Sequence, residues 1–387
     1  MTPDQLFSAL NELDAHSLRR VRRVLDGPQG VRVTQDGKPY LSFSSNDYLG
    51  LANHPDITFA AQQAAAKYGV GAGAAHLLTG HHRLHHTLET ELATFVGLPA
   101  ALLFSTGYMA SLGVLPALLD RHGEVFEDKL NHASLVDAAM LSRAKLTRYP
   151  HLDLVALEQR LASSSAKVKL IATDTVFSMD GDLAPLAELQ ALAQRYDSWL
   201  YLDDAHGFGV LGKRGEGALS HLSGAQDDRL IYLATLGKAA GVAGAFVGGS
   251  ADLIEWLVNK ARTYVFTTAQ PPLLAAAVSA SLRLIAADTW RRAHLIELIN
   301  RLKAGLAGLP WPLMHSNTPI QPLLVGGNAE ALRLADALRA QGILLPAIRP
   351  PTVPPGEARL RISLSAAHSQ ADVDTLCAAL HALAPHD

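Results

Sequence analysis

Seven short apolar segments between residues 100 and 250 constrain the fold of this 387-residue chain more than any other feature. Each is bounded by turn-forming or polar residues, and an apolar run of this length is typical of a buried strand. The segments are residues 100–105, 123–128, 145–150, 169–177, 199–204, 229–235 and 244–249. Helical patterns at 132–144 and 183–197 separate several of them. Because strands joined by crossover helices pair in parallel, we predict an α/β fold with a seven-stranded, mostly parallel sheet.

The segments on either side of this sheet predict smaller structural units. Residues 4–26 have helical periodicity, and residues 31–43 predict two strands joined by a turn at Asp36 and Gly37. Towards the C-terminus, helical patterns alternate with strand patterns in the order 273–308, 320–326, 329–341, 358–364 and 370–383. We therefore expect an N-terminal arm at residues 1–45, a large domain at 46–275 and a small C-terminal α+β domain at 276–387.

The composition excludes several classes of protein. Hydrophobic residues make up 49% of the chain and charged residues 18%, which is typical of a globular protein. A net charge of −3 gives no electrostatic reason to expect a nucleic acid or an anionic membrane as partner. No apolar run reaches the length of a membrane span, and the first residues lack a signal pattern, so we expect a soluble, cytoplasmic protein. The one cysteine, Cys377, should be a small buried hydrophobe.

Two of the predicted strands end in polar clusters. Residues 199–204 lead into Asp203, Asp204 and His206, and residues 229–235 lead into Thr235 and Lys238. Ligands of open α/β sheets bind at the carboxyl ends of strands, so these side chains should converge on one crevice. A lysine for a Schiff base, a carboxylate for a ring nitrogen and a hydroxyl for a phosphate suit pyridoxal phosphate (PLP). We therefore predict a PLP site.

Each candidate residue also has a simpler structural explanation. Lys238 alone would be a surface lysine, but the glycines around it leave room for a confined, weakly polar site that favours a neutral amine. Asp203 could cap a helix, and His132 could cap the helix that follows it instead of lying flat on the cofactor ring. Gly107 and Tyr108 follow a strand, at a turn whose N–H groups suit a phosphate. Ser178 could be a plain turn hydroxyl.

Two other motifs suggest different chemistry. Residues 207–212 match G-x-G-x-x-G and favour a nicotinamide or flavin oxidoreductase, but the fingerprint requires a helix next, where the sequence has Lys213-Arg214-Gly215. A second motif is a group of four histidines near a helix start, namely His81, His82, His85 and His86. No carboxylate or cysteine completes an obvious ligand set in the sequence, so we expect polar helix surface and no metal site.

Several motifs, in order, resemble one family. They are SSNDYLGL, GAAHLLTGHH, NHASL, SMDGDLAPL, DDAHGFGVLG, TLGKAAG and RPPTVP, between residues 44 and 354. From about residue 18 to 385 the chain is similar to the α-oxoamine synthases, PLP enzymes with the aspartate-aminotransferase fold. Ala205, Gly207 and the RPPTVP loop resemble the branch of the family that works in biotin biosynthesis.

The resemblance implies roles for individual residues. Lys238 would hold the cofactor and act as acid and base at the substrate α-carbon, and Asp203 would pair with the pyridine nitrogen. His132 would stack on the cofactor ring, and His206 would hydrogen-bond the ring oxygen. Further cofactor contacts would come from Gly107, Tyr108, Ser178 and Thr235, and from Thr267 and Thr268 of the partner subunit. Substrate contacts would come from Arg349, on the amino-acid carboxylate, and from Thr352 and Arg20. Asp174 and Thr175 differ from the glutamate and glycine of many relatives, so no role is assigned to them.

The resemblance also implies a reaction and partners. L-alanine would condense with a pimeloyl thioester, carried by coenzyme A or by acyl carrier protein, with loss of carbon dioxide. A site shared between subunits implies a homodimer. A related synthase that uses glycine or another acyl thioester is the nearest alternative, and the oxidoreductase is a distant one.

Overall fold

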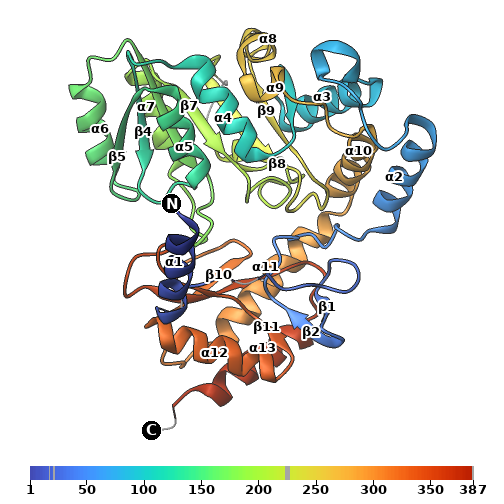
Figure 1. The fold of residues 1–387 in the computed structure, drawn as a ribbon, viewed down its shortest axis with the longest axis vertical. Helices are drawn as coiled ribbons and strands as arrows, with labels where there is room; N and C mark the ends of the chain where they lie inside the picture. The colour runs from blue at the N-terminus through green and yellow to red at the C-terminus, as the bar shows by residue number, and fades with distance from the viewer. Residues whose placement is uncertain (17, 21, 223–226, 386–387) are drawn as a thin grey trace. The chain divides into compact units, whose positions relative to one another are not determined.

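A computed structural model describes residues 1–16, 18–20, 22–222 and 227–385 of the chain. The chain divides into two compact units (Figure 1). The large unit is residues 46–296, and the small unit combines residues 1–45 with residues 297–387. The N-terminal arm of the sequence prediction is thus grouped with the C-terminal residues, and the large unit continues past residue 275.

The large unit is built on the predicted seven-stranded sheet, in the order β3-β9-β8-β7-β6-β4-β5. Its strands are β3 (Ala100–Phe104), β4 (Gly123–Asp128), β5 (Lys145–Tyr149), β6 (Val168–Asp174), β7 (Trp199–Asp203), β8 (Leu230–Thr235) and β9 (Ala245–Gly249). The pairs from β5 to β8 are parallel, and β9 is antiparallel to both neighbours. The predicted fold class and sheet are therefore confirmed, and the carboxyl ends of β4, β6, β7 and β8 meet at one edge.

Helices cover both faces of this sheet. They are α2 (Pro55–Tyr68), α3 (Arg83–Val96), α4 (Gly107–Leu118), α5 (Ala133–Ser142), α6 (Leu154–Ser163), α7 (Leu186–Arg195), α8 (Ala251–Lys260), α9 (Arg262–Val265) and α10 (Pro272–Ala287). Short helical turns occur at η1 (His76–Gly80) and η2 (Ala218–His221). Residues of α4, α5 and α8 form one buried core with Ile231 and Leu233 of β8. Tyr232 points to the other face and packs against Phe246, which contacts Phe208 and through it α3.

The small unit contains two three-stranded sheets, β1-β2-β11 and β10-β13-β12. Its strands are β1 (Arg32–Gln35), β2 (Lys38–Ser42), β10 (Ile320–Gly326), β11 (Ile343–Leu344), β12 (Ala347–Ile348) and β13 (Ala358–Ser363), and its helices are α1 (Pro3–Ala15), α12 (Asn328–Ala340) and α13 (Gln370–Leu383). Helix α11 (Thr289–Gly305) crosses the boundary between the units. N-terminal residues join the C-terminal ones through the parallel pairing of β11 with β2 and through Phe43, which stacks on His368 at 4.4 Å.

The hairpin of β1 and β2 has its turn where the sequence predicts it. Asp36 and Gly37 have φ values of 52° and 72°. Two successive residues with positive φ form the type I′ turn that suits a two-residue hairpin loop. Cys377 is buried, as expected.

The predicted helix at residues 4–26 is too long. Helix α1 ends at Ala15, and residues 18–20 and 22–26 are not helical, while Ser17 and Val21 lie outside the described residues. None of the described residues of α1 is buried, so no packing extends this amphipathic pattern. The arginines that follow it repel one another at helical spacings of three and four, which disfavours another turn.

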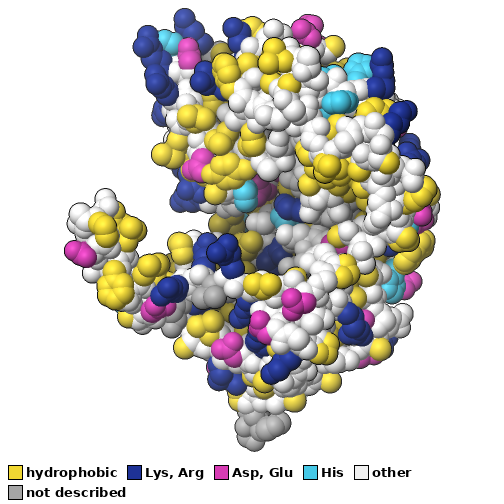
Figure 2. Space-filling model, turned by 45° about the vertical axis from the view of Figure 1, so that its right-hand side comes forward, with side chains coloured by type: hydrophobic (Ala, Val, Ile, Leu, Met, Phe, Trp, Pro, Cys, Tyr) yellow, Lys and Arg dark blue, Asp and Glu magenta, His cyan; other side chains and the backbone are white. Residues whose placement is uncertain are grey.

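The surface of the described residues carries charged and hydrophobic side chains side by side. On the face drawn in Figure 2, acidic and basic side chains are interspersed among hydrophobic ones. Within those residues no single helix is long and apolar enough to cross a membrane, and only α10 and α11 taken together, bent by 67°, meet the length and composition for it.

We expect the packing of Leu135, in α5, to contribute strongly to the stability of the large unit. Replacing Leu135, which is fully buried, in the variant Leu135→Ala should lower the free energy of unfolding by about 2–5 kcal/mol. Leu141→Ala in the same helix is the matched control, because its side chain is 57% exposed and its loss should change stability by less than about 0.5 kcal/mol. Urea denaturation followed by circular dichroism would measure both, and equal losses would contradict the packing described.

Candidate active site

A cavity of about 180 Å³ lies at the carboxyl edge of the large sheet. Its lining includes eight of the predicted site residues, namely Gly107, Tyr108, His132, Ser178, Asp203, His206, Thr235 and Lys238. Residues from the ends of β6, β7 and β8 and from the starts of α4 and α5 therefore converge, as the strand-end argument predicts. The sequence argument missed Ser134, Asp174, Val176 and Ala205, which also line the cavity.

Lys238 is held in a chain of hydrogen-bonding groups. Its Nζ lies 3.0 Å from His206 Nε2, and His206 Nδ1 lies 2.6 Å from the hydroxyl oxygen of Tyr48. Tyr48 donates its proton to Asn46 Oδ1 at 3.1 Å, so its oxygen accepts the Nδ1–H of His206. The lone pair of His206 Nε2 then faces the lysine amine. Sequence reasoning assigned no role to Tyr48, although it stands in the SSNDYLGL motif.

Two buried carboxylates end adjacent strands. Asp174 of β6 pairs in register with Asp203 of β7. Burial raises the pKa of Asp203, while the charges of Lys238 and His132 lower it. Burial and the charge of Asp203 raise the pKa of Asp174 well above its ordinary value, although the His132 N–H donates to its Oδ2 at 3.2 Å. The sequence pattern that could have identified Asp174 as a lining residue is its position as a polar residue at the end of a buried strand.

The start of α4 provides a cradle for an anion. Thr106 accepts the Met109 N–H at 3.1 Å and caps the helix, and the first amides of a helix lack intrahelical acceptors. A Cβ on Gly107 would lie 2.7 Å from Thr235 Cγ2, so only glycine leaves this corner open. Asp174 Oδ1 is buried without a hydrogen-bond partner among the described residues. The lysine, the carboxylate and the helix terminus together fit the amine-reactive, pyridine and phosphate parts of PLP.

Asp204, the neighbour of Asp203, has a structural role. It accepts hydrogen bonds from Thr175 and from the Tyr232 hydroxyl and the Ala218 N–H, the last two at 2.6 and 2.8 Å. Burial raises its pKa to about 7, although these hydrogen bonds oppose the shift. These contacts fix the loop at 205–217, which contains the G-x-G-x-x-G match. Turns and bends follow Asp203, with no α-helix, so the loop lacks the context of a dinucleotide site.

His132 and Ser178 both line the cavity, and different contacts fix the segments that carry them. His132 does cap α5, because its Nδ1 accepts the Ser134 N–H at 3.3 Å, and it lines the cavity as well.

The loop that carries Ser178 is connected to β4 by His151, whose two ring nitrogens lie 2.9 and 2.8 Å from Asp128 and Asp182. Burial opposes protonation of His151, but the hydrogen bonds and charges of the two carboxylates raise its pKa to about 10.

The remaining predicted site residues lie elsewhere. Thr267 and Thr268 belong to the large unit but do not line the cavity, and Thr268 forms a β-bridge with Ala75. The other three, Arg20, Arg349 and Thr352, belong to the small unit. There Arg20 Nη2 donates to Thr352 Oγ1 at 3.1 Å, and Arg349 lines a separate cavity of about 410 Å³ together with Arg23 and Arg339.

The histidine-rich segment differs from the polar helix surface that we expected. His85 is fully buried, and its Nε2–H donates to the Gln270 carbonyl at 2.9 Å. His76 is buried too, with its ring stacked on Tyr264 at 4.8 Å between centroids. Burial, followed by the charges of neighbouring histidines, lowers the pKa of His76 to about 3. These two rings are therefore neutral core residues.

Comparison with known proteins places this geometry in a family. Residues 38–380 match the aminotransferase class I and II family. The chain is 60% identical over 386 residues, 99% of its length and 100% of the relative's, to the 8-amino-7-oxononanoate synthase of Nitrosomonas eutropha. The chain belongs to the aminotransferase class I and II family, among its 8-amino-7-oxononanoate synthases. The predicted family and the prediction of a PLP-dependent enzyme are confirmed, and the oxidoreductase alternative is wrong.

Solved structures of the family agree. The 8-amino-7-oxononanoate synthase of Francisella tularensis superposes with a TM-score of 0.76 and 31% identity, over 89% of this chain and 97% of that one. A serine palmitoyltransferase variant from S. paucimobilis, with a bound PLP–myriocin aldimine, gives 0.91 and 27% identity over 98% and 96%. Both confirm the PLP-dependent transferase fold.

The charge on His151 predicts a pH-dependent contribution to stability. Its folded pKa of about 10 lies above the ordinary value of about 6.5, so its stabilisation is complete below pH 6.5 and disappears as the pH rises to about 10. His151→Gln should therefore lower the free energy of unfolding by about 1.5–3 kcal/mol at pH 6 and by much less at pH 10. Urea denaturation at both pH values would measure this. His122→Gln, at an exposed histidine, is the control, and a loss that does not depend on pH would contradict the assignment.

Proposed function

We propose that this chain catalyses the decarboxylating condensation of L-alanine with a pimeloyl thioester, which gives 8-amino-7-oxononanoate, carbon dioxide and a free thiol in biotin biosynthesis. The observation that carries the proposal is Lys238 Nζ, 3.0 Å from His206 Nε2, in a cavity with the buried carboxylate of Asp203. The 60% identity to a protein named for this product, over nearly the full length of both chains, supports the choice of product.

The residues of the cavity would hold PLP by its separate chemical parts. Lys238 would attach it covalently, Asp203 would accept a hydrogen bond from the pyridine nitrogen, and His132 would cover the ring. The phosphate would lie against the start of α4, where Gly107 and Tyr108 supply amides, with hydroxyls from residues that also line the cavity, Ser178 and Thr235. When bound, PLP supplies an electron sink that makes the α-proton of an amino acid removable.

Residues of this chain would control the proton at the substrate α-carbon. Lys238 lines the cavity and would act as the base, and its hydrogen bond to His206 holds the amine in one position. Tyr48 and Asn46 fix the orientation of the His206 ring from its other nitrogen. Lys238 and His132 favour the ionised form of Asp203, as a partner of a protonated pyridine nitrogen requires.

Substrate recognition would involve the small unit and a second subunit. Arg349 would bind the alanine carboxylate. Arg20 and Thr352, hydrogen-bonded to each other, would contact substrate, Arg20 through the pimeloyl part. Thr267 and Thr268 do not line the cavity of their own chain, which is what residues that complete the site of a partner in a homodimer would show. Delivery of pimeloyl by coenzyme A or by acyl carrier protein, and the cytoplasmic location, stay predictions.

An assay of substrate pairs tests the proposed function. The PLP-bound protein would be incubated with L-alanine or glycine and with pimeloyl-coenzyme A, pimeloyl-acyl carrier protein or palmitoyl-coenzyme A, and products would be identified by mass spectrometry. We expect 8-amino-7-oxononanoate from L-alanine and a pimeloyl thioester. Lys238→Ala should abolish turnover and keep the circular dichroism spectrum, whereas the exposed Lys213→Ala should keep activity. Preference for glycine or for a long acyl chain would reassign the enzyme to a sister synthase.

Arg349 provides a separate test of amino-acid binding. Arg349→Ala should raise the KM for L-alanine by about 10–100-fold, because a charge-assisted hydrogen bond to the carboxylate is lost. Steady-state rates at varied L-alanine would measure it. Arg333→Ala is the matched control, since Arg333 lies on α12 and forms a surface ion pair with Glu330 at 2.7 Å. An unchanged alanine dependence in Arg349→Ala would refute the assigned role.

A further inference from the structure

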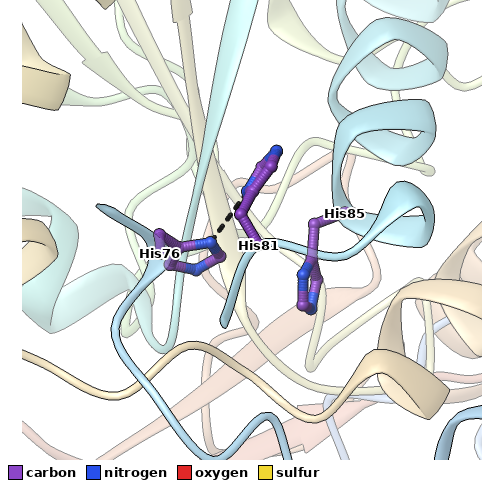
Figure 3. A group of neighbouring side chains, drawn as sticks. All are labelled: His76, His81 and His85. Atoms are coloured by element: carbon purple, nitrogen blue, oxygen red, sulfur yellow. Dashed lines mark hydrogen bonds between the residues drawn. The ribbon is translucent and has the colours of Figure 1, made fainter. Parts of the chain in front are cut away.

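The histidine-rich segment before and within α3 contains two sets of side chains that could hold a metal ion. One set is His76, His81 and His85, drawn in Figure 3. The other is His81, His86 and Glu89, and one ligand atom of each lies within 4.8 Å of the others. Because His81 belongs to both sets, the hydrogen bonds of the other members decide between them.

The first set is not available for a metal, because His85 is committed to the fold. Its Nδ1 accepts the His82 N–H at 3.0 Å, and its Nε2–H donates to the Gln270 carbonyl at 2.9 Å. Both ring nitrogens are thus used, and the side chain is fully buried. A ligating nitrogen needs a free lone pair, which His85 does not offer.

His76 instead orients His81 for the second set. The two Nδ1 atoms lie 2.9 Å apart, as the dashed line in Figure 3 marks. His76 is buried against Tyr264, and in the tautomer in which its Nδ1 accepts the Nδ1–H of His81, the lone pair of His81 is on Nε2. That atom lies 3.8 Å from Glu89 Oε2. A neighbour that fixes the tautomer of a ligating histidine is a regular part of metal sites.

Glu89 and His86 supply the other two ligands from one face of α3, because they are three residues apart. The side chain of Glu89 is only 13% exposed, and its Oε1 accepts the Leu103 N–H at 3.0 Å. Within the described residues, the one basic group within 4.0 Å of this carboxylate is His81, with no lysine or arginine. A nearly buried carboxylate with so little compensation favours a cation. His86 is exposed, so an ion can enter from solvent.

We propose that His81, His86 and Glu89 bind one divalent transition-metal ion, with Zn²⁺ the best match, and that His76 is a positioning residue. Two imidazoles and one carboxylate are ligands that Zn²⁺ accepts, and they leave a position for water. The site borders the segment that carries Thr267 and Thr268, because Ala75 bridges to Thr268 and His85 holds Gln270. A bound ion would therefore stabilise this part of the large unit.

Equilibrium dialysis tests this proposal independently of activity. Tag-free, full-length protein with PLP bound would be dialysed against Zn²⁺, the metal per chain measured by mass spectrometry, and the Tm recorded with and without Zn²⁺. We expect one ion per chain and a rise in Tm. His86→Gln and Glu89→Gln should each weaken binding by at least about 10-fold and reduce the rise in Tm, and His76→Gln should weaken it by about 10-fold.

The neighbouring His82→Gln is the matched control and should bind as the unaltered protein does. His86 is exposed, so His86→Gln should keep the fold, which circular dichroism would check, and it tests the site even where a buried substitution disturbs the chain. An unchanged Kd in both His86→Gln and Glu89→Gln would show adventitious surface binding only and overturn the proposal. The absence of saturable Zn²⁺ binding would overturn it as well.

Discussion

The register between β6 and β7 places two carboxylates side by side, and the chemistry of the cavity depends on this. Asp174 and Asp203 are paired across the parallel strands, and both are buried. Two such groups cannot both ionise in a site of low dielectric unless positive charge lies nearby. Burial raises the pKa of both, but the charges of Lys238 and His132 oppose the shift at Asp203, whereas the pKa of Asp174 stays well above its ordinary value although Lys238 opposes that shift as well. Asp203 is thus the more acidic of the two and the one suited to a cationic ring.

The alternation of side chains along a strand explains why Asp204, next to Asp203, has a different role. Successive side chains of a strand point to opposite sides, so Asp203 reaches the cavity while Asp204 points away from it. Asp204 uses its oxygens to hold Thr175, Tyr232 and Ala218, and thereby anchors the loop that leads away from β7. The sequence therefore contains two neighbouring aspartates with separate tasks, one for the ligand and one for the loop that shapes its pocket.

The sequence predicts the strands of the large sheet well, because strands buried on both faces are continuous apolar runs, and β4 has the predicted limits at both ends. The same logic finds eight lining residues of the cavity at strand ends. It fails where tertiary contacts decide. Periodicity cannot show that α1 has nothing to pack against, so the helix was extended past Ala15. Periodicity also does not show that His81 lies beside Glu89, eight residues later in the chain, or that His85 is buried in the core.

The distribution of charge around the cavity also determines how a cofactor can lie in it. Asp203, the more acidic of the two carboxyls, makes one end negative, whereas the start of α4 at Gly107 presents amides that lack intrahelical acceptors and the positive end of the helix dipole. A ligand with a cationic ring nitrogen and an anionic phosphate fits in one direction, because the reverse would place its phosphate beside the carboxylates. Lys238, at the end of the β8 segment, is then the amine available to the ring. PLP would thus be oriented by electrostatics that the sheet topology imposes, with its ring nitrogen held by Asp203 and its phosphate by the start of α4.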